Sequence, residues 1–150
     1  PVAKVYMGLS SQFVWKNWDL GFNMRASLGN YAYNNTFSDN ASMHVYNDQG
    51  YLVNLYEDCL KTGWRGTSSN EQKRSDYFLE NASYLKMDNI TLGYTFDKFF
   101  TDKISGRISA SVQNVFTITK YSGLDPECSA IDGTAWPRSR TFTLGLNLNF

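Results

Sequence analysis

The chain has 150 residues and a formal net charge of zero, with 14 basic and 14 acidic side chains. This balance gives no basic stripe of the kind that nucleic-acid binding needs, so no nucleic-acid partner is expected. No stretch approaches the roughly 18–20 uninterrupted apolar residues of a spanning helix, which excludes a helical membrane protein. Aromatic residues make up 16% of the chain, which suits the aromatic girdles of a membrane β-barrel better than a compact core.

Two adjacent segments near the N-terminus have the alternating pattern of membrane-crossing strands. Residues 18–28 alternate cleanly, whereas residues 5–15 do so more weakly because Ser11 interrupts the apolar positions. Both segments reach the roughly 9–11 residues that a spanning β-strand needs. Arg25 falls on the polar face of the second segment.

A long connection, residues 29–83, follows these strands. Within it, residues 50–63 carry apolar side chains at helical spacing, which predicts a short helix. His44 is the only histidine, so a nucleophilic Ser-His pair would have to use it. Its place in a polar loop favours an ordinary exposed histidine, and no enzyme is expected.

Two further strands are expected at residues 84–96 and 104–116. The second half of residues 84–96 alternates cleanly, but Lys86 and Asp88 fall in the apolar register of the first half. That half is therefore expected to rise beyond the bilayer or to contain a bulge. In residues 104–116, Arg107 shares the polar face with several serines.

Residues 117–140 form a second long connection with candidate binding residues. Three of its acidic residues could form a cation site: Asp125, Glu127 and Asp132. Turn chemistry around Pro126 explains the same residues equally well, and no metal or other cofactor is expected. Aromatic side chains of both long connections could stack on sugar rings or on peptide side chains, with packing inside the loops as the alternative. The aromatic candidates for such contacts are Tyr46, Trp64, Tyr121 and Trp136.

The two cysteines, Cys59 and Cys128, lie in different long connections and form no metal-type Cys-x-x-Cys pair. In an oxidising compartment they could form one disulfide, and otherwise they are two unrelated thiols.

Residues 141–150 have the strongest alternation in the chain. One face is wholly apolar and consists of Phe142, Leu144, Leu146, Leu148 and Phe150. The other face carries only small or polar groups, as expected of a strand with one face in lipid and one towards a wet interior. Phe150 is expected in an aromatic girdle, and we predict that it is an assembly signal where the barrel assembly machinery pairs with the chain.

The connections between the five expected strands alternate short, long, short and long. Outer-membrane barrels keep short turns on the periplasmic side and long loops outside. If residue 150 ends at the periplasmic face, both short turns lie in the periplasm, and the loops 29–83 and 117–140 both lie outside. The pattern therefore predicts a bacterial outer-membrane protein with its C-terminus at the periplasmic face.

Three segments carry a resemblance to a known family. Residues 83–96 read SYLKMDNITLGYTF, residues 112–127 contain VQNVFTITKY and GLDPE, and residues 136–150 read WPRSRTFTLGLNLNF. These segments resemble the end of SusC-type TonB-dependent transporters of Bacteroidetes. Met87, Asp88, Trp136 and Ser139 depart from the family pattern without altering the strand pattern. Residues 8–34 resemble the family more loosely, and the loop that follows them is not recognisable.

The resemblance implies an antiparallel all-β transmembrane barrel of about 22 strands with an N-terminal plug. Five strands cannot close such a barrel, because exposed edges in lipid leave backbone groups unpaired. The chain begins at Pro1 without a targeting signal, so we expect it to be the C-terminal part of a transporter, comprising the last five strands without the plug.

The resemblance also implies active import of a large nutrient, an oligosaccharide or an oligopeptide. The implied partners are a SusD-like surface lipoprotein, TonB-ExbB-ExbD acting through the missing N-terminal part, and the lipid bilayer. Arg25 and Arg107 would then line the transport path or form ion pairs with the plug. The alternative function is a passive porin or a structural outer-membrane barrel protein.

Overall fold

The computed structural model describes residues 2–41, 50–52, 57, 75–97, 104–128, 130–133 and 136–149. The chain divides into two compact units. The large-sheet unit consists of Lys4–Leu28, Tyr84–Thr119 and Arg138–Phe150. The small-sheet unit consists of Pro1–Ala3, Gly29–Ser83 and Lys120–Pro137.

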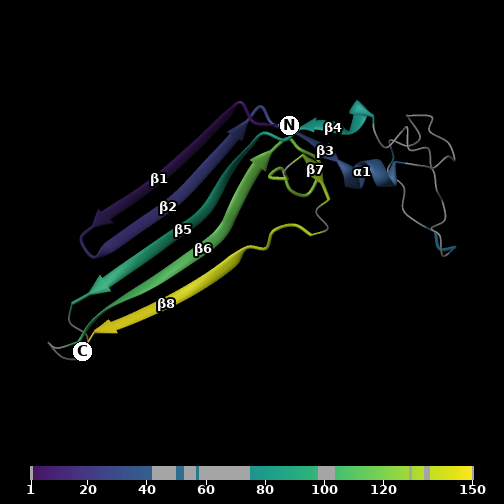
Figure 1. Cartoon of the computed structure of the whole chain (residues 1–150). Helices are drawn as coiled ribbons and strands as arrows, with labels where there is room; N and C mark the ends of the chain where they lie inside the picture. Colours follow the sequence, from purple (N-terminus) through teal and green to yellow (C-terminus); the bar gives the residue numbers. More distant parts are fainter. Residues whose placement is uncertain are drawn as a thin grey trace. The chain divides into compact units, whose positions relative to one another are not determined.

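Five long antiparallel strands in the order β1-β2-β5-β6-β8 form the large sheet (Figure 1). Their bounds are Val5–Trp15 (β1), Trp18–Leu28 (β2), Tyr84–Phe96 (β5), Ser105–Thr119 (β6) and Thr141–Asn149 (β8). The first three coincide with the bounds expected from the alternation of side chains. β6 begins one residue later than expected and continues three residues further, because its pairing with β5 extends to Thr119. The antiparallel all-β fold class is confirmed.

The register of the large sheet gathers polar side chains into rows on one face. One row crosses all five strands through Gln12, Gly21, Thr91, Ser111 and Thr143. The neighbouring row of the opposite face contains Phe13, Leu20, Leu92, Ala110 and Leu144. Pairing directly opposite places residues on the same side of the sheet, so the strands together have one polar and one apolar face.

The apolar face is largely uncovered. Leu144 is 84% exposed, Phe142 73% and Trp15 69%. A water-soluble domain rarely leaves so continuous an apolar surface exposed, because burying it stabilises the fold.

A β-bulge in the first half of β5 explains its irregular pattern. Asn23 pairs with Asn89, and the next residue, Met24, pairs with Met87, so Asp88 is the extra residue. The bulge reverses the phase of β5 beyond this point, placing Lys86 opposite Arg25 on the polar face. Of the two possibilities that the sequence left open for this half strand, the bulge is the one observed.

β6 departs from regular pairing at the same level as the β5 bulge. Asn114 has a left-handed backbone conformation with φ 53°, and β8 pairs with β6 only as far as Gln113. The Asn114 side-chain amide donates to the Ser139 carbonyl at 2.9 Å, and Arg140 Nε donates to the Asn114 carbonyl at 3.4 Å. Asn114 therefore fixes where β8 begins to pair.

Three short strands in the order β4-β3-β7 form the small sheet. β3 (Tyr31–Asn34) runs antiparallel to β4 (Leu79–Asn81) and parallel to β7 (Ile131–Asp132). The unit also contains helix α1 (Asn35–Asn40) and the 3-10 helix η2 (Asp76–Phe78). Segments of both long connections thus share one sheet.

The side chain of Asn34 begins α1 by accepting a hydrogen bond from the Phe37 backbone N–H at 2.9 Å. In the part of the chain that the structure describes, no helix has the length and apolar character to cross a membrane. The helix expected at residues 50–63 lies largely outside the described residues, which include only 50–52 and 57 of it.

Replacing Asn114 tests its role in the large sheet. Asn114→Ala should destabilise the folded protein by about 1–2 kcal/mol, because alanine disfavours positive φ and loses the hydrogen bond to Ser139. Asn114→Gly keeps the backbone conformation and should therefore be destabilised less. Heat-induced unfolding of the full-length gene product in detergent measures both variants. An alanine variant at least as stable as the glycine variant would contradict this role.

Candidate functional site

The polar face of the large sheet carries an ion pair that spans three strands. Arg107 on β6 donates from Nε to Asp19 Oδ1 on β2 at 3.0 Å, and its Nη2 donates to Asp19 Oδ2. Gly93 of the intervening strand β5 lies between them, opposite Asp19. A Cβ atom at this position would lie 2.7 Å from the Arg107 guanidinium carbon and would also meet the Asp19 carboxylate. The missing side chain of Gly93 thus leaves the space that the ion pair occupies.

A second ion pair lies at the level of the bulge. Arg25 Nε donates to both carboxylate oxygens of Asp88, at 3.0 and 2.8 Å. Lys86 Nζ lies 4.0 Å from Asp88 Oδ1, and the Lys86 side chain is almost fully buried. Both arginines predicted to face the lumen therefore lie on the polar face, and each is paired with a carboxylate of the sheet itself.

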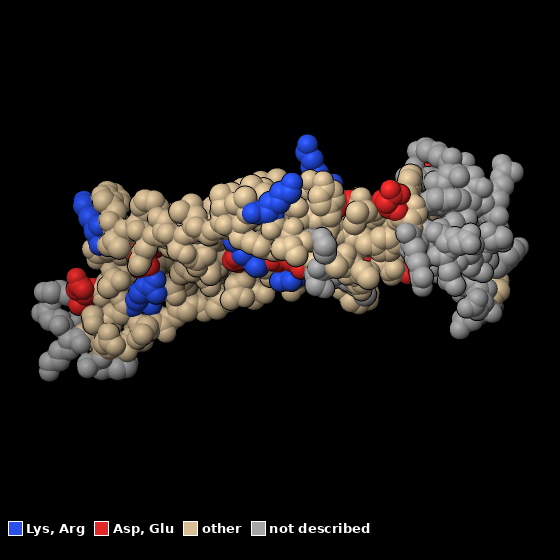
Figure 2. All heavy atoms as spheres, turned by 45° about the horizontal axis from the view of Figure 1, so that its top comes forward, with Lys and Arg blue, Asp and Glu red and all other residues tan. Residues whose placement is uncertain are grey.

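Acidic and basic side chains adjoin each other on the face seen in Figure 2 rather than gathering into patches of one sign. This agrees with the two ion pairs, each of which places an arginine next to a carboxylate of the large sheet.

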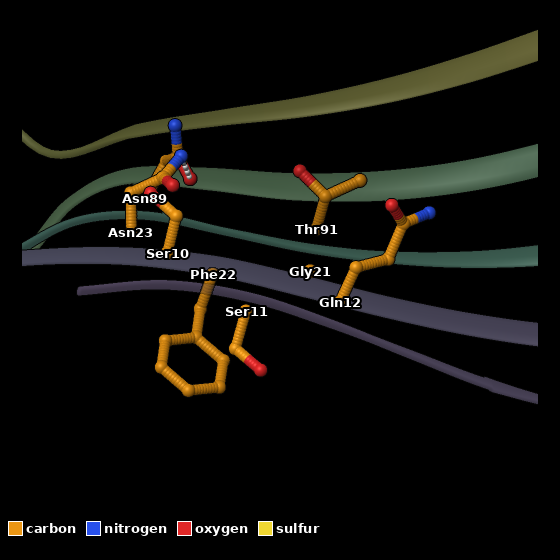
Figure 3. Close-up of a pocket in the computed structure, with 8 residues that line it drawn as sticks. All are labelled: Ser10, Ser11, Gln12, Gly21, Phe22, Asn23, Asn89 and Thr91. Atoms are coloured by element: carbon orange, nitrogen blue, oxygen red, sulfur yellow. Dashed lines mark hydrogen bonds between the residues drawn. The ribbon is translucent and has the colours of Figure 1, made fainter.

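A shallow pocket of about 410 Å³ lies on the polar face. It is lined by Ser10, Ser11, Gln12, Gly21, Phe22, Asn23, Asn89 and Thr91 (Figure 3). The Asn23 amide donates to the Asn89 side-chain oxygen at 2.9 Å. In Figure 3 the hydroxyl and amide groups of Ser10, Gln12 and Thr91 lie on the same side of the strands as this pair, whereas Phe22 and Ser11 point to the other side.

The pocket offers hydrogen-bond donors and acceptors but no ionised group. Hydroxyl and primary amide groups both donate and accept, so this surface suits an uncharged polar ligand or polypeptide backbone. The described residues contain no group of three or more side chains that could together hold a metal ion.

The small-sheet unit places Tyr121 in its core. The residue is 6% exposed, contacts the cluster of Ala32 and Ala82, and donates its hydroxyl to Asp132 Oδ2 at 3.0 Å. Burial, followed by the hydrogen bond to Asp132, raises the pKa of Tyr121 well above its usual range. Tyr121 therefore packs inside the loops, the alternative to ligand stacking. Trp136 is 82% exposed, so it stays a candidate for ligand contact.

The acidic residues of the second loop are engaged in turn chemistry. Asp132 Oδ2 also accepts from the backbone N–H groups of Leu124 at 3.1 Å and Asp125 at 3.4 Å. Asp125 Oδ1 accepts from the Glu127 backbone N–H at 2.9 Å. These bonds hold the Asp-Pro-Glu turn against β7.

Several residues singled out from the sequence lie outside the described part of the chain: His44, Tyr46, Cys59, Trp64 and Phe150. Cys128 is a free thiol in this structure, and Cys59 lies outside the described residues, so both alternatives for the pair, a disulfide or two unrelated thiols, stay expectations. Burial raises the pKa of the Cys128 thiol, and the negative charges of Asp132 and Asp125 raise it further.

The carboxylate partners on the polar face, Asp19 and Asp88, and the role of Gly93 were not predicted from the sequence. The pattern of side chains places Asp19 on the correct face, but only the pairing of β2 through β5 to β6 brings it to Arg107. Glu80 on β4 was not predicted either, and it accepts from Ser122 Oγ at 2.7 Å and from the Ser122 backbone N–H at 2.9 Å. No local signal links these two residues across 42 positions of sequence.

Comparison with known proteins finds long relatives of which the chain matches a small part. The TonB-dependent receptor SusC of Bacteroides thetaiotaomicron is 42% identical over 158 aligned residues, which cover 100% of this chain and 15% of SusC. The TonB-dependent receptor P3 of Formosa agariphila is 27% identical over 175 residues, covering 100% of this chain and 17% of that receptor. No family model matches the chain. Neither relative is named as an enzyme.

Two solved structures of the RagAB peptide importer have the same fold. The closed-closed state superposes with a TM-score of 0.73 at 22% identity, and the open-open state with 0.66 at 21% identity. Each match covers 97% of this chain and 17% of that chain. At this level of identity the likeness establishes the fold of the segment.

Gly93→Ala tests the space left for the Asp19–Arg107 ion pair. The added methyl group should displace both side chains and lower the midpoint of thermal unfolding of the full-length gene product by a few degrees. Gly8→Ala on β1 is the matched control, because a Cβ there meets nothing within 4 Å. Equal midpoints for the two variants would show that a methyl group at position 93 is accommodated without cost, contrary to the close contacts described above.

The raised pKa of Cys128 predicts slow alkylation. At pH 8 the folded protein should react with iodoacetamide more slowly at Cys128 than an ordinary thiol does, and the rise of its rate with pH should be displaced towards higher pH. Mass spectrometry of the Cys128 peptide in a Cys59→Ser variant measures the rate. Unfolding in urea removes the burial and should restore an ordinary pH profile. Identical profiles for folded and unfolded protein would contradict the assignment.

Proposed function

Because the chain belongs to the SusC-type TonB-dependent receptors, a family of outer-membrane proteins, we propose that it forms part of an active importer of large nutrients. The chain matches 15–17% of the length of the SusC and P3 receptors, so the activity of the whole protein is inferred from this segment. The proposed cargo is an oligosaccharide or an oligopeptide.

The observation that supports the proposal is the two-faced large sheet. Its strands have 9–15 residues, which is enough to cross the roughly 30 Å hydrocarbon core when tilted. The exposed apolar face matches the lipid-facing surface of a barrel, and the polar face matches a wet interior. We infer that the free edges of β1 and β8 pair with further strands of the same barrel.

The connections at the two ends of the strands differ in length, as do the periplasmic turns and outer loops of an outer-membrane barrel. Short connections join β1 to β2 and β5 to β6, whereas the long connections contain the small-sheet unit. This supports an outward position for both long loops and a periplasmic C-terminus, with Phe150 as the assembly signal. A SusD-like lipoprotein would cooperate with the outer loops, and TonB-ExbB-ExbD would act through an N-terminal plug.

The polar face is compatible with either class of cargo. Its two arginines are each paired with a carboxylate, and its amides and hydroxyls can bond with sugar hydroxyls or peptide groups. RagAB is described as a peptide importer, which supports the oligopeptide. Exposed Trp136, together with Tyr46 and Trp64, remains our proposal for ligand contact in the loops.

Lysine substitutions on adjacent residues of β8 test the proposed membrane orientation. Leu144→Lys should destabilise the inserted protein by about 2–4 kcal/mol and reduce its outer-membrane yield, because it places a charge in lipid. Thr143→Lys is the matched control, because its side chain lies on the polar face and should be tolerated. Quantitative immunoblots of outer-membrane fractions measure both.

Uptake by cells that carry the full-length gene completes the same test. Labelled oligosaccharide or oligopeptide uptake should be lost in Leu144→Lys cells and in cells without TonB. Uptake that persists without TonB would favour the passive porin. Equal membrane yields for the two lysine variants would contradict the membrane orientation.

A further inference from the structure

The turn between β1 and β2 has an unusual backbone for its sequence. Trp15 and Trp18 pair directly, leaving Lys16 and Asn17 as a two-residue hairpin loop. Lys16 has φ 54°, a left-handed conformation that such turns usually assign to glycine or asparagine. A lysine held in this conformation suggests a functional role, because side chains with a Cβ disfavour it.

The turn is attached firmly to the neighbouring strand. The Thr95 backbone N–H donates to the Asn17 carbonyl at 2.8 Å, and the Asn17 side-chain amide donates to the Thr95 carbonyl at 2.8 Å. Asn17 thereby anchors the loop to the end of β5. The position of Lys16 follows from these bonds and from the pairing of the flanking tryptophans.

A row of exposed aromatic rings lies next to this loop. Trp15, Trp18 and Tyr94 form one row of the apolar face, and the Trp18 and Tyr94 ring centroids are 4.8 Å apart. All three side chains are exposed, Trp15 most of all. Tryptophan and tyrosine favour the level of lipid headgroups, because their rings are apolar while their N–H and O–H groups seek polar partners.

The ammonium group of Lys16 is available to an external anion. It lies over the Trp15 ring, 5.3 Å from the ring centroid. Within the described residues no carboxylate forms an ion pair with it, and the nearby Asp19 is paired with Arg107 on the opposite face. A cation fixed beside a row of interfacial aromatic rings is complementary to a phosphate at the same depth.

We propose that the β1–β2 turn is a binding site for the phosphate of an anionic phospholipid headgroup. The Lys16 ammonium contacts the phosphate oxygens, and the Trp15 and Trp18 rings lie against the glycerol and upper acyl region. This inference rests on the proposed function, because it requires the apolar face to lie in lipid. It adds a specific lipid contact that anchors this end of the β1–β2 hairpin at the membrane surface.

Native mass spectrometry of the full-length gene product in detergent, titrated with phosphatidylglycerol, tests the site. Lys16→Gln should weaken apparent phosphatidylglycerol binding about fivefold, as expected for one lysine near an anionic surface. Lys16→Arg should bind as the unmodified protein does. Lys4→Gln removes the same charge at the other end of β1 and should leave binding unchanged. Lys16→Gly also removes the charge and relieves the backbone, so it replaces Lys16→Gln if that variant does not fold.

The results distinguish a specific phospholipid site from general anion binding and from loss of membrane insertion. Unchanged binding in the charge-removing variants, or an equal loss in Lys4→Gln, overturns the proposal. Displacement of the lipid by inorganic phosphate at equal concentration, or equal binding of phosphatidylcholine, also overturns it. Protein that is absent from the outer membrane contradicts the proposed function itself. Correct insertion without a Lys16-dependent lipid preference contradicts this inference alone.

Discussion

Antiparallel pairing in a continuous register is the constraint on which the large sheet depends. Because side chains alternate along each strand, a slip of one residue would exchange its apolar and polar faces. In β5 the alternation changes phase on the N-terminal side of Asn89. Without a bulge, Lys86 would therefore lie on the apolar face. The bulge at Asp88 restores the order by placing Lys86 beside Arg25, and Asn114 accommodates the change in the next strand. Both irregularities thus preserve the separation of lipid-facing from interior-facing surface.

The separation of the apolar and polar faces also determines which charged side chains form ion pairs on the polar face. Asp19 and Arg107 lie two strands apart, and only a residue without a side chain between them lets the ion pair close. Exposed ion pairs add little stability, so the main effect is on the electrostatic field. Paired charges flank a pocket of hydroxyls and amides, which can form and release hydrogen bonds with an uncharged polar group.

The alternation of residues 18–28 and 141–150 predicted strands and faces because period-two patterning is a local signal. It also predicted that Arg25 and Arg107 share the polar face. It could not predict their partners, since these depend on which strands become neighbours across the loop 29–83. Tyr121 shows the same limit. Its sequence neighbours suggest an exposed loop, but Ala32 and Ala82, distant in sequence, enclose its ring.

The small-sheet unit shows how long polar connections can still be ordered. Asp132 is fully buried and accepts from Tyr121, Leu124 and Asp125, while the Asn30 amide donates to the carbonyls of Ala82 at 2.9 Å and Pro126 at 3.4 Å. Among the described residues, every buried polar side-chain atom has a hydrogen-bond partner. Removing one partner from a polar core of this kind is destabilising, because each buried polar group left without a hydrogen bond costs free energy. Hydrogen bonds between the two long loops therefore stabilise the conformation of both, and a substitution in one loop should destabilise the other.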